Sequence, residues 1–246
     1  MSVRLPLGTF INMATVALGS TIGMALEQSF PPDIKLIVFQ AIGLCVLLIG
    51  LTMAQKVPEG YLLLLIFSML LGGITGQGLR LDQWFTRLGD GFQELLGVGG
   101  AGFTEGLVTT FLLFCVGSMT IVGAIEEGIQ GKREQLLIKS LLDGFTSVAL
   151  AATYGVGVLF SIIPMLLFQG GITILAGRAQ AFFTPKIVGT LSACGGLLIL
   201  GIGINMLEMA SIKVENLLPA LLVAAALAYG YQKVEGRRQP GDNATV

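Results

Sequence analysis

The sequence predicts an all-α polytopic membrane protein with about eight transmembrane helices. Of its 246 residues, 54% are hydrophobic and only 12% are charged, whereas soluble domains carry about 25% charged residues. The mean hydropathy is +0.84, and apolar stretches of roughly 20 residues, enough to cross a bilayer core, recur along the chain. Residues 1–235 are therefore expected to form a single transmembrane domain, and the polar tail 236–246 to be disordered in the cytoplasm.

Polar or proline-containing breaks separate the apolar helices. The first run is interpreted as a span and not a signal peptide, because no small-residue cleavage site follows it. Pro31 and Pro32 separate the first two spans, and Pro58 separates the second from the third. The expected spans are Thr9–Leu26, Ile34–Ala54, Tyr61–Gly78, Gly102–Ile125, Leu136–Thr153, Val156–Ala176, Ile187–Leu207 and Leu217–Tyr231.

The stretch 144–177 has no charged residue and is too long for one ordinary helix. A sharp turn at Thr153–Gly157 would divide it into two short spans. A re-entrant or interrupted helix is the alternative.

The segment 80–96 has a different pattern, with apolar side chains at helical spacing on one face and charged side chains on the other. This pattern predicts an amphipathic helix in the membrane interface, with Trp84 at the level of the headgroups. The alternative is a loop helix packed on the bundle.

Basic residues set the orientation. With eight spans, ten Lys and Arg residues lie on the side of the termini and four on the other side. This asymmetry predicts that both termini are cytoplasmic, in a bacterial inner (plasma) membrane.

An internal repeat is the most informative pattern. The motif Phe30-Pro31-Pro32-Asp33-Ile34 resembles Phe183-Thr184-Pro185-Lys186-Ile187, and an ungapped match continues through the following helix. The repeat units would be 9–78 and 156–231, which are helices 1–3 and 6–8, around a central helix pair at 102–153. An offset of five spans reverses direction, so the repeats would be inverted, as in many secondary transporters. Chance similarity between Gly- and Leu-rich helices is the alternative.

Carboxylates in apolar segments are the main candidates for a substrate or ion site, because ionisable groups in membrane spans usually serve a cavity or a partner. Glu105 and Asp143 are expected to share one central site. The other candidates are the neutral ligands Thr104, Ser118, Thr146 and Gln169, and the secondary candidates Glu126, Glu127 and Lys139.

A structural interpretation competes with each candidate. Glu105 and Asp143 could instead cap helix N-termini, Lys139 could extend to the membrane surface, and Glu126 and Glu127 could be solvated beside a basic loop. In antiparallel helices the two capping carboxylates would lie on opposite sides of the membrane. They could converge only if glycines at 97–102 formed an unwound or re-entrant segment and the fifth helix likewise began below the membrane surface.

Four neutral polar residues within spans are expected mainly to join helices by hydrogen bonds. Positions near helix ends count against a substrate role for Asn12 and Asn205. Gln169 is the best of the set, because the glycines that follow it could expose backbone carbonyls. The fourth is Gln40.

Several functional classes receive no support from the sequence. The chain has no His, and its three Cys lie far apart in apolar segments, so no metal is assigned. No enzymatic motif is present, and we expect no enzyme activity, no cofactor and no nucleic-acid partner. Gly-rich helices allow close contacts between protomers, and a homo-oligomer is expected, with a dimer favoured.

The central segment carries a family resemblance. Its motifs are Phe114-Cys115-Val116-Gly117-Ser118-Met119, Gly123-Ala124-Ile125, Lys139-Ser140, Leu142-Asp143-Gly144 and Gln169-Gly170. Together they resemble a family of bacterial membrane proteins catalogued as domain of unknown function 554. The resemblance covers nearly the whole chain and implies a polytopic inner-membrane protein, without a substrate.

The expected function is therefore a transporter or channel for a small solute or ion, with coupling to a cation or proton as an option. A non-transporting membrane scaffold or assembly subunit is the alternative. The partners expected in either case are the lipid bilayer and a second copy of the chain.

Overall fold

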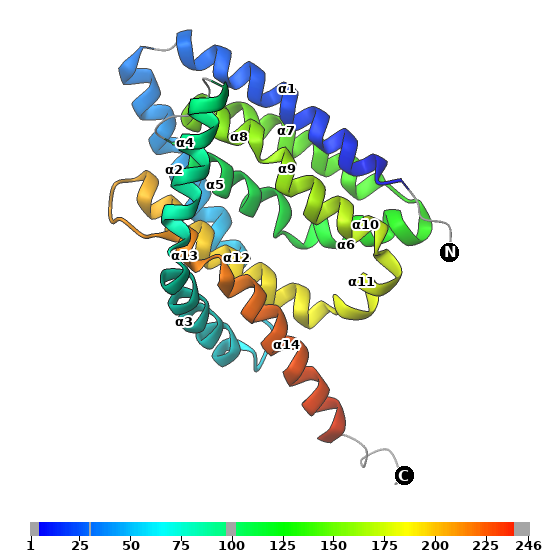
Figure 1. Ribbon diagram of the computed structural model, residues 1–246. Helices are drawn as coiled ribbons and strands as arrows, with labels where there is room; N and C mark the ends of the chain where they lie inside the picture. Colours follow the sequence, from blue (N-terminus) through cyan, green and yellow to red (C-terminus); the bar gives the residue numbers. More distant parts are fainter. Residues whose placement is uncertain (1–4, 30, 97–101, 239–246) are drawn as a thin grey trace.

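The computed structural model describes residues 5–29, 31–96 and 102–238, and within these ranges the chain is helical, with no strand. Figure 1 shows helices from both halves of the chain packed into one bundle. The helices are α1 Leu7–Ser29, α2 Pro32–Ala54, α3 Leu62–Leu79, α4 Leu81–Leu96, α5 Phe103–Cys115, α6 Ser118–Gln130, α7 Glu134–Tyr154, α8 Val156–Phe160, α9 Ile162–Met165, the π-helical η1 Leu166–Gly170, α10 Gly171–Ile174, α11 Ala176–Phe182, α12 Pro185–Met206, α13 Val214–Leu217 and α14 Pro219–Arg238.

Six helical segments among the described residues are long and apolar enough to cross a membrane. They are Leu7–Leu26, Leu62–Leu79, Glu134–Tyr154, Val156–Ile174, Pro185–Met206 and Val214–Glu235. The pair α5–α6, bent by 59°, makes a seventh if it forms one broken span, and the apolar stretch Gln40–Ala54 of α2 is shorter. The chain is thus an all-helical membrane protein, while the expected number of eight spans is not confirmed.

Large apolar side chains cover the outward faces of these helices. Leu18, Ile74, Phe145, Leu167 and Leu222 are each at least 67% exposed. Exposed apolar surface of this extent is typical of contact with a membrane.

The expected span Gly102–Ile125 is not one continuous helix. α5 ends at Cys115, and Gly117 takes an extended conformation with φ −75° and ψ 148° before α6 begins. The Thr120 hydroxyl donates a 2.6 Å hydrogen bond to the Phe114 carbonyl. This bond satisfies an acceptor at the end of α5, where the helix no longer provides a donor.

The expected division of the stretch 144–177 is confirmed. α7 ends at Tyr154, and Gly155 takes φ 66° and ψ −140°, a conformation suited to Gly. The next span is itself interrupted. Pro164 lacks a backbone amide, and the backbone then widens into the π-turn η1.

Two further expectations concern the segment 80–96 and the C-terminal tail, and Figure 1 shows the helices α4 and α14 found there. A helix, α4, lies in the segment expected to be amphipathic, while an amphipathic helix in the membrane interface stays a prediction. At the C-terminus, α14 continues to Arg238, three residues into the segment expected to be disordered. Residues 239–246 lie outside the described residues.

The α1–α7 pair makes the most extensive contact between helices distant in sequence (Figure 1). Gly19 lies against the Gly144 carbonyl and the Ser147 hydroxyl, and Gly23 lies against the Val148 carbonyl. Residue numbers rise together in the contacting pairs of α1 and α7, so the two helices run parallel. Their small residues let the backbones approach closely, as is common in membrane bundles.

The α2–α12 pair runs antiparallel with four reciprocal contacts. These contacts join Gly43 to Met206, Gly196 to Met53, Gly50 to Leu200, and Gly203 to Leu47. α3 and α14 also run antiparallel, because Gly72 meets Ala220 while Tyr61, before α3, meets Tyr231.

Candidate functional site

The parallel packing of α1 and α7 places Asn12 beside Asp143. The Asn12 side-chain amide donates a 2.9 Å hydrogen bond to Asp143 Oδ2. Asn12 is fully buried and Asp143 is 6% exposed. The sequence argument undervalued Asn12 because it lies near a helix start, although the four-residue spacing of Gly8, Asn12 and Val16 places it on the face that packs against α7.

Lys139 completes an ion pair with Asp143 one turn away on α7. Its ammonium also lies 5.3 Å from the centre of the Phe114 ring, an arrangement that favours a cation. Lys139 is 5% exposed, so the expectation that it extends to the surface is wrong. Asp143 lies well inside α7, which begins at Glu134, so Asp143 does not cap the N-terminus of that helix.

Gln169 reaches the same cluster from the π-turn η1. Its side-chain oxygen accepts a 3.3 Å hydrogen bond from Asn12 Nδ2. A π-turn adds a residue to the helical turn and is often found at functional sites. The four residues Asn12, Lys139, Asp143 and Gln169, from three helical elements, form what we call the central polar cluster.

Two atoms of the central polar cluster are buried and make no hydrogen bond within the protein. They are Asn12 Oδ1 and Gln169 Nε2, an acceptor and a donor. Buried polar groups are nearly always paired, so unpaired ones indicate a ligand, an ion or water. The cluster can therefore receive a small polar species that both donates and accepts hydrogen bonds.

Glu127 forms a second buried polar group beside the N-terminus of α1. Its Oε1 accepts 2.8 Å hydrogen bonds from the Gly8 amide and from Arg133 Nε. Glu127 is fully buried, so the expectation of a solvated carboxylate is wrong for this residue. Glu127 Oε2 and the buried Thr9 hydroxyl are also unpaired. Glu126, its neighbour, is partly buried.

Glu105 lies elsewhere. It is exposed on the first turn of α5, where it lines a cavity of about 20 Å³ together with Tyr154 and Glu215. Tyr154 is eleven residues beyond Asp143 on α7, about 16 Å along the helix. The structure therefore does not bring Glu105 to Asp143, and residues 97–101, which would have had to carry it inward, lie outside the described residues.

The neutral candidates are also separated. Thr104 is partly exposed next to Glu105. The Thr146 hydroxyl donates to the Leu142 carbonyl of its own helix. Ser118 begins α6, and its side chain is outside the described part of the chain. Among the neutral candidates whose side chains are described, Gln169 alone lies in the central polar cluster, through its hydrogen bond with Asn12. No group of three or more Cys, Asp or Glu suited to a metal occurs among the described residues.

The chain resembles proteins of two bacteria, one of which is named as a membrane protein. It is 31% identical to the "Uncharacterized membrane protein YdfK" of Bacillus subtilis (strain 168) over 224 residues, 90% of this chain and 95% of that protein. It is also 31% identical to the "Uncharacterized protein YqgA" of Escherichia coli (strain K12) over 227 residues, 90% of this chain and 96% of that protein. No solved structure matches the chain. Residues 7–229 match the family described as "Protein of unknown function (DUF554)", and the chain therefore belongs to the DUF554 family.

Proposed function

We propose that the protein is a membrane transporter or channel for a small polar solute or ion, with the central polar cluster as its binding site. The observation that carries the proposal is the buried Lys139–Asp143 pair, joined to two amides that retain unpaired atoms. Charged groups within a membrane are costly and usually serve a substrate or ion pathway. A buried ion pair adds little stability compared with apolar packing, so stability alone does not account for it.

The reciprocal contacts between α2 and α12 support the inverted repeat. In the ungapped alignment, Gly43 corresponds to Gly196 and Met53 to Met206. Gly43 contacts Met206 while Gly196 contacts Met53. Exchange of equivalent partners is what a two-fold axis between the helices produces, and their antiparallel course matches inverted units. Transporters with inverted repeats bind substrate at the repeat interface.

The proposed topology has eight spans, with α2 and the bent α5–α6 pair added to the six long segments. Two polar contacts support this arrangement. Lys213 pairs with Asp82, and Lys186 pairs with Glu235. Each pair therefore joins segments that the topology assigns to the same side of the membrane. Both termini would be cytoplasmic in a bacterial inner membrane, with α4 in the interface opposite. The protein would act without an enzymatic step, as a homo-oligomer and most simply a dimer, which native mass spectrometry in mild detergent would reveal.

Reconstitution tests the proposed activity. Purified protein in liposomes would be screened with ions and small metabolites by uptake and by solid-supported-membrane electrophysiology. We expect flux of at least one solute, loss of this flux in Asp143→Asn, and retained flux in the matched control Thr146→Val, whose hydroxyl bonds to its own helix.

The scaffold alternative makes the opposite prediction. A scaffold would show no flux above that of empty liposomes for any solute of the panel. Equal flux in the wild type and in folded Asp143→Asn would show that the central polar cluster takes no part in transport.

A further inference from the structure

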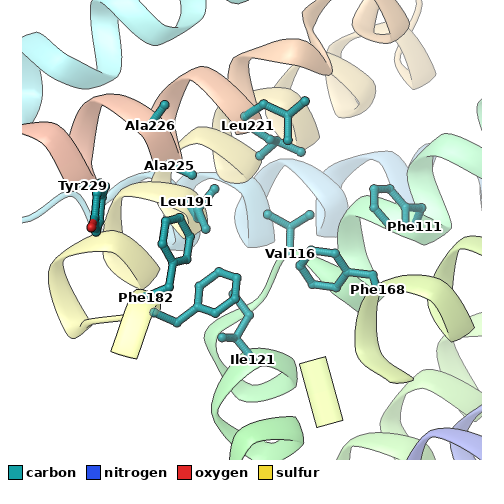
Figure 2. A pocket seen from close by; sticks show the side chains of 12 residues that line it. Phe111, Val116, Ile121, Phe168, Phe182, Leu191, Leu221, Ala225, Ala226 and Tyr229 are labelled. Atoms are coloured by element: carbon teal, nitrogen blue, oxygen red, sulfur yellow. The ribbon is translucent and has the colours of Figure 1, made fainter. Parts of the chain in front are cut away.

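A second feature of the bundle is a large apolar cavity, separate from the central polar cluster. It has a volume of about 500 Å³, within the range of ligand sites in proteins. Its walls come from α5, the α5–α6 break, α6, η1, α11, α12 and α14, and Figure 2 shows the side chains around it. Apart from the Tyr229 hydroxyl, every lining side chain is apolar.

The side chains that line the cavity form a row with aromatic residues at both ends. At one end, Phe168 lines the cavity and directly precedes Gln169 of the central polar cluster. At the other end are Phe182 and Tyr229, whose ring centres are 5.6 Å apart. Figure 2 shows Phe111 and Phe168 at one end of the row of side chains and Tyr229 at the other.

Aromatic and charged residues mark the level of Tyr229 as a membrane interface. Two residues farther along α14, Tyr231 contacts the Tyr61 ring edge to face, with ring centres 5.2 Å apart. The Lys186 ammonium lies 5.5 Å from the Tyr61 ring and pairs with Glu235. Tyr residues and Lys side chains of this kind gather where hydrocarbon meets headgroups.

A basic residue follows on the cavity face of α14. Leu222, Ala225, Ala226 and Tyr229 line the cavity, and Lys233 lies four residues after Tyr229, on the same face of the helix. Lys233 is exposed, and it forms no ion pair among the described residues. An apolar cavity that opens beside an aromatic ring and an exposed ammonium matches a lipid, with its chain inside and its phosphate at the basic residue.

We propose that this cavity holds one acyl chain of an anionic phospholipid, whose phosphate binds Lys233. The chain would lie against Val116 and Ile121, on either side of the α5–α6 break, and against Phe168 of η1. A lipid bound there stabilises the folded protein by an amount that rises with the logarithm of lipid concentration once this exceeds the Kd. The inference does not depend on transport, because lipid binding is measured without any flux.

Photo-crosslinking locates the site directly. Full-length protein would be incubated with a phosphatidylglycerol that carries a diazirine on its acyl chain, irradiated and analysed by peptide mass spectrometry. We expect enrichment of adducts on the cavity segments 111–121, 168–191 and 221–229. Labelling spread evenly over exposed apolar faces such as α3, with no enrichment at the cavity, would overturn the proposal.

Native mass spectrometry with variants tests chain and headgroup separately. Titration with phosphatidylglycerol is expected to give one tightly held lipid per protomer. Ala225→Trp, which fills the cavity, should abolish that binding, whereas Leu70→Trp, on an exposed face of α3, should retain it. Lys233→Gln should lower the preference for phosphatidylglycerol over phosphatidylcholine by about fivefold, and Lys132→Gln should not.

Two results of this titration would contradict the proposal. Equal lipid binding in Ala225→Trp and Leu70→Trp would place the lipid elsewhere. A lipid-free dimer that dissociates in Ala225→Trp would show that a second copy of the chain fills the cavity. Because the crosslinking uses the wild-type chain, a misfolded variant would not prevent a decision.

Discussion

Asn12 and Asp143 are 131 residues apart in the sequence and are joined by a 2.9 Å hydrogen bond. The bond exists because glycines on α1 and α7 let these parallel helices approach closely. Asp143 thus has two partners of different kinds, the Lys139 ammonium and the Asn12 amide. A change in either partner alters the surroundings of the same carboxylate.

Neutralising one member of the buried ion pair should be more harmful than neutralising both. Asp143→Asn leaves the Lys139 ammonium buried without its counter-ion, which costs about 3–5 kcal/mol in buried pairs. Lys139→Met/Asp143→Asn removes both charges and should recover most of this loss. Thermal unfolding in detergent would measure the stability of three variants, namely Asp143→Asn, Lys139→Met and the double variant. Losses that simply add in the double variant would show that the two charges do not interact.

The close contact of α1 with α7 should not tolerate a side chain at Gly19. A Cβ atom there would overlap the Gly144 carbonyl and the Ser147 hydroxyl, and overpacking of this kind costs about 1–3 kcal/mol. Gly171→Ala is the matched control, because a Cβ at Gly171 meets no atom within 4 Å. The control should be neutral or more stable by up to about 1 kcal/mol. Fluorescence-detected size exclusion after heating would compare the melting temperatures of Gly19→Ala and Gly171→Ala. Equal melting temperatures would contradict the α1–α7 contact.

Local chemistry made part of this structure predictable. Gly155 was expected in a turn because glycine allows unusual backbone angles, and the helix does end there. The 3.6-residue period brings Lys139 and Asp143 together within one helix, so their contact follows from spacing. Gln169 was selected among the neutral polar residues and lies in the central polar cluster.

Contacts between distant helices were not predictable in the same way. Asn12 seemed unpromising because it lies near a helix end, and Glu127 because it lies beside a loop, yet tertiary packing buries both. Glu105 and Asp143 were grouped by residue type, whereas the packing of α5 places Glu105 beside the last turn of α7. The direction in which a helix crosses its neighbour decides which of their residues meet. The hydropathy of a sequence carries little information about that direction.

The eight-span topology predicts which loops a membrane-impermeant reagent reaches. Single cysteines would replace Gln55, Lys132, Gln83 or Glu208 in a chain without Cys45, Cys115 and Cys194. Positions 83 and 208 should react with an impermeant maleimide on intact spheroplasts. Positions 55 and 132 should react only after the membrane is permeabilised. Labelling of position 132 from outside would mean that the bent α5–α6 pair does not cross the membrane.

The Asp82–Lys213 ion pair should make the attachment of α4 sensitive to acid. Lys213 Nζ lies 2.8 Å from Asp82 Oδ2, and this hydrogen bond is the main reason that the pKa of Asp82 lies below its ordinary value of 3.8. A carboxyl whose pKa is lowered by folding stabilises the folded state fully above its unfolded pKa. That contribution declines below about pH 3.8 and is lost as the pH falls through the folded pKa.

Trp84 provides a probe for this acid transition, because it is the single Trp of the chain, lies in α4 two residues after Asp82, and is 57% exposed. Its fluorescence and acrylamide quenching should stay constant above pH 4 and change at lower pH, as α4 loosens from α13. Lys213→Gln should move the midpoint upward, toward the ordinary pKa of Asp, and Asp82→Asn should remove this step. Lys132→Gln, on the other side of the proposed topology, should leave the midpoint unchanged. An identical acid transition in Asp82→Asn would assign it to other carboxyl groups, and the Asp82–Lys213 pair would then have no part in holding α4.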